Sequence, residues 1–410
     1  MATELDDFRW RPILLSAYGP TAMASLGYGA LAPIVALAAS ELGAGVATAA
    51  LVVGLTAFGQ LVGDLPAGAI AAKLGERRAL LLASALDAAS MTTAYFAHSL
   101  LVLAIAVFVD GLAGSVFNLA RHAWMTVAIP LRYRARALSS LGGTFRIGLF
   151  FGPFIAAGLI AAFSIHAVFL FAACTGLAAG ALTLTMADLP APTADTSTGP
   201  ASAPPQVTVA GVIRRHWRVL ATIGVGVLLI SAARASRQSI LPLWSQAQHL
   251  DAAAISVIFG IASGVELLLV YPGGAVMDRF GRVFVAVPAV VLMGVGLGLL
   301  PLAHSAVTIC LVACVMAIGN GLSSGIVLTL GSDAAPVIGR AQFLGAWRFL
   351  ADAGGMLGPG LISLVTVFGT LAGAALVLVG VCAVGAGWLA AWAPRRDPAG
   401  RDSVLRSSTS

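Results

Sequence analysis

Charged residues are scarce in this chain. Only 10% of its 410 residues are Asp, Glu, Lys or Arg, 59% are hydrophobic, and the mean hydropathy is +0.97. A soluble domain carries about 25% charged residues. The composition of this chain therefore excludes a soluble domain, and most of the chain must lie in lipid. There the backbone forms only α-helices or a closed β-barrel, because no water satisfies its polar groups. The apolar runs are roughly 20 to 28 residues long, which is the length of membrane-spanning helices; barrel strands need only about 9 to 11 residues.

Signatures of several other protein classes are missing. No Gly-x-x-x-x-Gly-Lys loop is present, which argues against ATP as an energy source within this chain. The first apolar run has no cleavage site and is too long for a signal peptide, so we expect no secretory signal. A Gly-x-Ser-x-Gly pattern at residues 321–325 lies inside an apolar run. A nucleophile there would need a strand, a sharp turn and a helix, so we expect no enzymatic activity.

Cysteine is also scarce, and all four cysteines fall in apolar runs: Cys174, Cys310, Cys314 and Cys382. Cys310 and Cys314 share a helix face, so a metal site can be imagined. Cysteine as a small apolar side chain is the simpler interpretation, and we expect no metal and no cofactor. The net charge of +6 concentrates in short loops, as in membrane proteins, and does not indicate a nucleic-acid partner.

A short polar stretch between two apolar runs organises the chain. Residues 272–282 read PGGAVMDRFGR, and an earlier copy at residues 66–76 reads PAGAIAAKLGE. The offset is 272 − 66 = 206 residues. The same offset superposes Gly54 on Gly260, Pro130 on Pro336, Arg134 on Arg340 and Gly152-Pro153 on Gly358-Pro359. One offset without gaps predicts a tandem duplication with several spans in each half.

This repeated stretch resembles motif A of the major facilitator superfamily, Gly-x-x-x-Asp-Arg-x-Gly-Arg between the second and third spans of a half. The motif positions are Gly68, Lys73, Gly75, Arg77, Gly274, Asp278, Arg279, Gly281 and Arg282. The resemblance implies an all-α membrane protein with twelve transmembrane helices in two pseudo-symmetric six-helix bundles. It also implies that the acid of the first motif caps the start of span 11. That acid is replaced by Ala72 here, and Asp64 or Glu76 could substitute for it.

Apolar runs predict twelve spans at about 12–39, 46–71, 79–97, 100–129, 137–163, 166–186, 217–244, 252–276, 283–302, 305–333, 341–368 and 370–393. The predicted domains are a first six-helix bundle (1–186), a linker (187–216), a second bundle (217–393) and a tail (394–410). The linker composition, rich in Pro, Ala, Ser and Thr, is typical of a disordered segment.

Basic residues predict the orientation of the spans. Of the 23 Lys and Arg residues, 18 lie in alternate loops or at the chain ends, and the remaining loops have none. Positive loops face the cytoplasm. We therefore expect a multi-pass protein of the cell membrane with both termini in the cytoplasm.

Ten charged residues fall inside the predicted spans, although each charge at mid-helix costs roughly 2.5–3.5 kcal/mol on insertion scales. The candidates for substrate or proton binding are Asp110, Glu266, Arg234, Arg237, Arg146, Arg121, Asp64, Arg348 and Asp352. Asp110 and Arg121 lie about three turns apart on one helix face. Arg348 and Asp352 can pair within one helix, which would make them structural. The tenth residue, Asp87, lies on span 3, which the resemblance places outside the cavity, so a structural role is the simpler interpretation.

Gly148, Gly152 and Pro153 on span 5 resemble the core of motif C, which the superfamily's drug–proton exchangers carry. Ordinary Gly-rich helix packing is the alternative, because span 11 holds an equally good copy.

The resemblance implies secondary transport by alternating access. Our first expectation is a proton-coupled exporter of small amphipathic or drug-like molecules, driven by the proton gradient. The alternative is a proton symporter or facilitator for a small metabolite, which the arginines of spans 5 and 7 would suit if it is anionic. The expected partners are a small-molecule substrate, protons and the lipid bilayer, and a monomer is expected.

Overall fold

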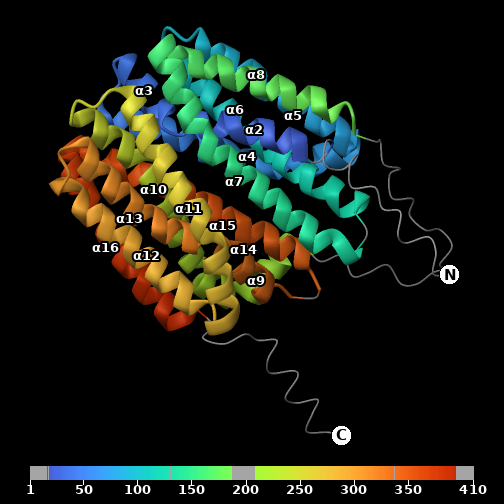
Figure 1. Ribbon diagram of the computed structural model, residues 1–410. Helices are drawn as coiled ribbons and strands as arrows, with labels where there is room; N and C mark the ends of the chain where they lie inside the picture. The colour runs from blue at the N-terminus through green and yellow to red at the C-terminus, as the bar shows by residue number, and fades with distance from the viewer. Residues whose placement is uncertain (1–15, 17, 130, 187–207, 337, 394–410) are drawn as a thin grey trace, which may run out of the picture.

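The computed structural model of the protein describes residues 16, 18–129, 131–186, 208–336 and 338–393, and these contain helices but no strand. The first fifteen residues, most of the predicted linker (187–207) and the predicted tail (394–410) lie outside the described residues. Figure 1 shows the helices of the two halves as two bundles that lie side by side.

In the described residues, the first bundle contains seven helices that form six spans. They are α2 (Gly19–Leu31), α3 (Ile34–Glu41), α4 (Val46–Leu74), α5 (Glu76–Tyr95), α6 (Leu100–Ala128), α7 (Leu131–Ala162) and α8 (His166–Thr183). Helices α2 and α3 form one span that is bent by 46° at a short break. Pro33 stands directly before α3. A proline there removes a backbone donor, so it permits the bend.

The second bundle repeats this order. Its elements are α9 (Val209–Val219), the π-helix η2 (Leu220–Gly224), α10 (Val225–Ala247), α11 (Ala252–Phe280), α12 (Val283–Leu299), the short 3₁₀ helix η3 (Leu300–Leu302), α13 (Ala306–Leu322), α14 (Ile326–Ala334), α15 (Arg340–Phe368) and α16 (Leu371–Trp392). The last eight residues of the predicted linker, 209–216, are helical and continue into span 7 through a kink at His216.

Helix boundaries repeat with the offset seen in the sequence. Helices α4 and α11 each have 29 residues, and both their starts (252 − 46) and their ends (280 − 74) differ by 206. The N-caps of α6 and α13, Ser99 and Ser305, are also 206 residues apart, and each accepts a backbone hydrogen bond. Equivalent residues therefore begin and end equivalent helices in the two halves.

Ten helices of the described chain are long and apolar enough to cross a membrane, and the bent α2–α3 pair makes eleven. The twelfth predicted span is α5, which has 20 residues and packs against α6 and α8. Polar residues such as Asp87, Ser90 and Thr93 lower its mean hydropathy. Large apolar side chains such as Leu65, Leu268 and Phe284 are exposed on the outside of the protein. A soluble protein rarely exposes so many, and lipid covers them in a membrane. The chain is a multi-pass membrane protein with the predicted all-α fold.

Basic side chains gather at one end of the bundles, which we call the basic end. It carries Lys73, Arg77, Arg78, Arg279, Arg282 and Arg340 of the described helices. The connections at the opposite end hold His98, His249, Asp251 and His304, and none of them contains Lys or Arg. The loops that contain basic residues therefore lie at one end of the bundles, and the loops without them lie at the other end.

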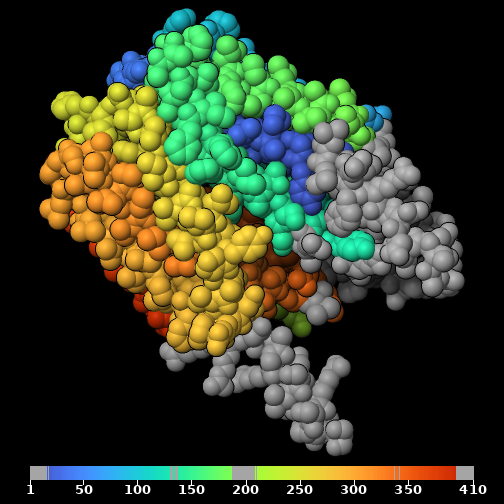
Figure 2. Space-filling view, viewed as in Figure 1, coloured from blue at the N-terminus to red at the C-terminus, as the bar shows by residue number. Residues whose placement is uncertain are grey.

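The two bundles meet along α4–α15 and α7–α11 and part toward the basic end. A Cβ added at Gly54 would lie 3.2 Å from Pro359, and one at Gly264 would lie 2.9 Å from Phe150. Closer to the basic end, a Cβ at Gly68 or Gly274 would meet no atom within 4 Å. Figure 2 shows this separation as a gap between α7 (teal) and α11 (yellow), through which orange residues of the second bundle are visible.

Candidate functional site

A cavity of about 330 Å³ lies between the bundles and holds most of the charged residues predicted from the sequence. Its walls contain Asp110, Arg121, Arg146, Arg234, Arg237 and Glu266, together with Tyr28, Asp87, Gln238 and Asn320. A second cavity of about 470 Å³ continues it toward α15 and shares Tyr28, Asp110 and Arg234. These charges lie where both bundles contribute to one space.

The cavity has an acidic side that belongs to the first bundle. Asp87 on α5 and Asp110 on α6 line this side of the cavity and lie close to each other. Two ionised carboxylates this close repel each other, so a proton shared by the pair would stabilise them. Among the described residues, no Lys or Arg lies within ion-pair distance of either aspartate.

Asp87 was not among the predicted site residues, because its span was expected to lie outside the cavity. The structure places α5 against α6, and a Cβ at Gly176 of α8 would collide with the Asp87 carboxylate. The absence of a side chain at Gly176 leaves room for Asp87 beside the cavity. The one available signal was the charge itself, because an intramembrane carboxylate is a candidate functional group by default.

The cavity has a basic side that both bundles provide. Arg146 on α7 donates a hydrogen bond to Ser324, and Arg234 on α10 donates to the side-chain oxygen of Asn320 at 2.6 Å. Neither arginine has a carboxylate within ion-pair distance in the described part of the chain. Both guanidinium groups are therefore held by neutral hydrogen-bond partners, and the carboxylate whose charge acts on both, that of Glu266, is paired with Arg237.

Arg121 adds a third arginine nearer the basic end. Its side chain is 7% exposed, donates to Thr21 at 3.3 Å and Asn118 at 2.8 Å, and stacks over Phe117. Its Nε atom is buried and has no hydrogen-bond partner among the described residues. A buried charge is costly unless it is paired, so this position is suited to an anion that enters the cavity.

Arg237 and Glu266 form a close ion pair between α10 and α11, and both residues are 6% exposed. Asn320 donates to Glu266 at 2.8 Å and also accepts the hydrogen bond from Arg234. The two arginines of α10 therefore have different partners, because Glu266 neutralises Arg237 whereas Arg234 donates to the Asn320 amide. Asn320 was missed by the sequence analysis, although a polar amide inside an apolar span marks a buried contact.

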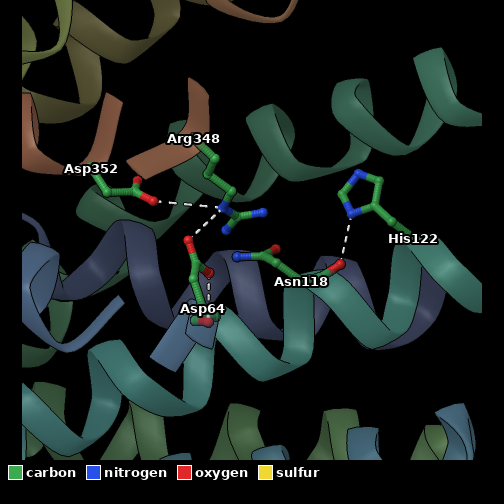
Figure 3. A network of polar contacts seen from close by, with 6 residues as sticks. Asp64, Asn118, His122, Arg348 and Asp352 are labelled. Carbon is green, nitrogen blue, oxygen red and sulfur yellow. Dashed lines mark hydrogen bonds and ion pairs between the residues drawn. The ribbon is translucent and has the colours of Figure 1, made fainter. Parts of the chain in front are cut away.

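Arg348, Asp64 and Asp352 form a network across the two bundles (Figure 3). Arg348 Nε on α15 lies 2.8 Å from Asp64 Oδ2 on α4 and 3.6 Å from Asp352 Oδ2. Ser115 of α6 donates to the other oxygen of Asp64 at 2.7 Å. The pair of Arg348 and Asp352 predicted within one helix exists, but the shorter contact of Arg348 joins the two halves.

Residues 21–359, and again residues 223–407, match the Major Facilitator Superfamily. The chain belongs to this superfamily. A segment of 105 residues is 30% identical to "Uncharacterized MFS-type transporter YhjO" of Bacillus subtilis (strain 168). That segment spans only 26% of this chain and 26% of the relative.

Solved transporters of similar fold cover nearly the whole chain. A POT family transporter in complex with a thioalcohol conjugated peptide has a TM-score of 0.77 at 13% identity, over 93% of this chain and 96% of its own. The nucleoside transporter NupG has a TM-score of 0.70 at 13% identity, over 92% and 98%. These likenesses show the fold alone. The superfamily and the fold together make the protein a secondary transporter rather than an enzyme.

The motif A residues of this superfamily member lie at the basic end, outside the cavity. Gly75 and Gly281 have positive φ angles of 81° and 100°, which let the chain turn tightly between spans. Arg77 donates to the carbonyl of Leu184 at 2.7 Å. Arg282 pairs with Asp333 at 2.8 Å.

The acid of the second motif behaves differently from the two arginines. Asp278 is exposed and has no polar partner among the described residues in this conformation. It lies on α11, which packs against α7 of the first bundle. On the other side, the contact between α4 and α15 is made by Asp64, two turns before Ala72.

The motif C-like residues lie at a helix crossing. A Cβ at Gly148 would collide with Ser25 of α2, and one at Gly152 would lie 2.5 Å from the backbone of Ala30. The copy on α15 does the same, since a Cβ at Gly358 would lie 2.5 Å from the Ala232 carbonyl of α10. Both copies therefore permit close packing of helices, and their presence in both halves gives no specific signal for export.

Proposed function

We propose that this protein transports a small solute with an anionic group by alternating access, coupled to proton movement. The observation that carries this proposal is the pair Arg146 and Arg234, which face one cavity without a carboxylate partner. A cation in a protein interior needs a compensating charge. The separation of the bundles at the basic end gives the solute a route to these arginines.

Proton coupling is supported by the proximity of Asp87 and Asp110, two carboxyl groups of the same cavity that a shared proton would stabilise. A carboxyl pair that holds a proton in one state and loses it in another can couple proton flow to the transport cycle. The proton gradient is the proposed energy source. We propose the cell membrane as the location, with the basic end in the cytoplasm.

The cavity supports the second of the two functions expected from the sequence better than the first. A pocket for drug-like molecules is lined predominantly by apolar and aromatic side chains with few polar groups. Here seven charged residues line about 330 Å³, together with four aromatic residues, Tyr28, Phe117, Phe145 and Phe259. Export of amphipathic molecules remains the competing proposal.

The test is transport by purified protein in liposomes that contain a pH-sensitive dye. The panel contains mono- and dicarboxylates, phosphate monoesters and uncharged amphipathic dyes. We expect anionic members to move and to change the internal pH. Arg234→Gln should lose this transport, while Arg215→Gln, an exposed arginine of α9, should retain it. Transport of the uncharged dyes alone, unaffected by Arg234→Gln, would contradict the proposal.

A further inference from the structure

The cavity has an acidic wall and a basic wall, and Arg121 of α6 and the paired Glu266 of α11 also line it. Asp87 and Asp110 come from α5 and α6, whereas Arg146 and Arg234 come from α7 and α10. In one enclosed space, opposite charges attract strongly. No carboxylate of the acidic wall nevertheless lies within ion-pair distance of an arginine of the basic wall in the described structure.

We propose that the solute is a zwitterion whose cationic group binds the Asp87–Asp110 pair and whose anionic group binds Arg146 and Arg234. This inference rests on the proposed transport function and names its substrate class. A solute with an anionic group alone would satisfy the arginines and leave the acidic wall without a partner. A solute with both groups satisfies both walls with one molecule.

The two walls also lie at different depths along the helices, so the bound zwitterion would have a defined orientation. Counting residues from the helix ends, Asp87 and Asp110 lie about 12 to 15 Å from the end opposite to the basic end. Arg234 and Arg146 lie about 20 to 24 Å from it on the same count. The walls are thus about 5 to 12 Å apart along the helices, with the arginines nearer the open basic end.

Binding of the cationic group has a consequence for the proton of the acidic pair. In this proposal one proton bridges the two carboxyl groups before binding, because two like charges this close repel each other. An ammonium group supplies several N–H donors and one positive charge, so it replaces that proton as the bridge. The proton leaves to water in the cavity, and the charge at the pair is conserved. Solute and proton then compete for the same two carboxylates.

The test uses two sets of matched probes with detergent-purified protein. One set is δ-aminovalerate, valerate and pentylamine. The other is trialanine, N-acetyl-trialanine and trialanine amide, whose backbone extends to about 10 Å. Each set contains a zwitterion, an anion and a cation built on the same backbone. Binding is read by calorimetry, and proton release is read in a weakly buffered solution with a pH dye.

We expect at least one zwitterion to bind at least tenfold more tightly than its matched anion and to release a proton. Asp110→Asn should remove this difference and the proton release, but should keep the affinity for the anion. Arg234→Gln should weaken both the zwitterion and the anion. Glu41→Gln, an exposed acid near the opposite end, serves as the matched control and should change nothing.

Three outcomes would overturn the inference. Equal binding of zwitterion and anion in the native protein excludes an acidic subsite, while the proposed anion transport survives. Binding of the cation alone contradicts both proposals. No binding by any probe, in protein that retains its native thermal unfolding, contradicts both as well.

Asp110→Glu keeps the charge and should restore part of the preference for the zwitterion.

Discussion

Arg348 on α15 lies 2.8 Å from Asp64 on α4, and these residues are 284 positions apart in the sequence. The contact stands at the level where the two bundles begin to part, because Gly68, one turn further along α4, faces open space. It is therefore the last described polar contact between α4 and α15 before the basic end. Motion between the bundles must stretch or break it.

Removing this ion pair should shift the balance between conformations. We expect Asp64→Asn and Arg348→Gln each to change the ratio of states about fivefold or less. The reason is that Arg348 is 41% exposed, and exposed pairs contribute only about 0.2–1 kcal/mol. Spin labels at Lys73 and Gly345, with the exposed Cys174 replaced by alanine, report the distance between the basic ends of α4 and α15.

A double-mutant cycle controls for effects unrelated to the pair. If Asp64→Asn and Arg348→Gln act through one contact, the double variant should resemble either single variant. Fully additive shifts in the label distances would show that the two residues do not act on the equilibrium together.

Neutralising the acidic pair should separate transport from the proton gradient. We expect Asp110→Asn and Asp87→Asn to abolish uphill transport driven by a pH gradient, because one carboxyl alone has no partner with which to share the proton. Exchange of solute at equal pH should persist at a reduced rate. Uphill transport at the native rate in both variants would show that another acid carries the proton.

Loss of Glu266 should instead act on stability. Glu266→Gln leaves Arg237 buried without a counter-charge, and breaking a buried pair costs about 3–5 kcal/mol. We expect a lower thermal unfolding temperature in detergent. The double variant Glu266→Gln with Arg237→Gln should recover part of the loss, because it removes the unpaired charge. An unchanged unfolding temperature in the single variant would instead favour a role for Glu266 in coupling.

The orientation of the chain can be tested with reporter fusions. Because all described basic loop residues lie at one end, fusions after Pro200 and after Ser410 should both report the cytoplasm. A fusion at His98, in a connection of the opposite end, should report the outside. A reversed pattern would place the basic end outside and would contradict the positive-inside assignment.

The glycines of the motif C-like segment should matter through packing. Gly148→Ala places a methyl group against Ser25, so we expect poor folding and a broad size-exclusion profile. Gly158→Ala on the same helix meets open space and is the matched control. Folded, transport-competent Gly148→Ala protein would show that α2 and α7 can separate without loss of function.

Much of the architecture was determined by the sequence alone. Helix length and apolarity are fixed by the thickness of the bilayer and by its lack of hydrogen-bonding partners. For this reason the 206-residue repeat predicted helices such as α4 and α11, whose bounds repeat with the same offset. The resemblance of the repeated motif also predicted the superfamily, which the comparison with known families confirmed.

Only the tertiary structure decided which charges meet. Asp64 could pair with Arg348, and Asp87 with Asp110, only after the rotation and crossing of four helices had been set. Those depend on side-chain packing at many positions, such as the contact of Gly148 with Ser25, and no short stretch of sequence encodes them. Arg348 and Asp352 illustrate the limit, since a four-residue spacing predicted their pair but not the closer partner across the bundle interface.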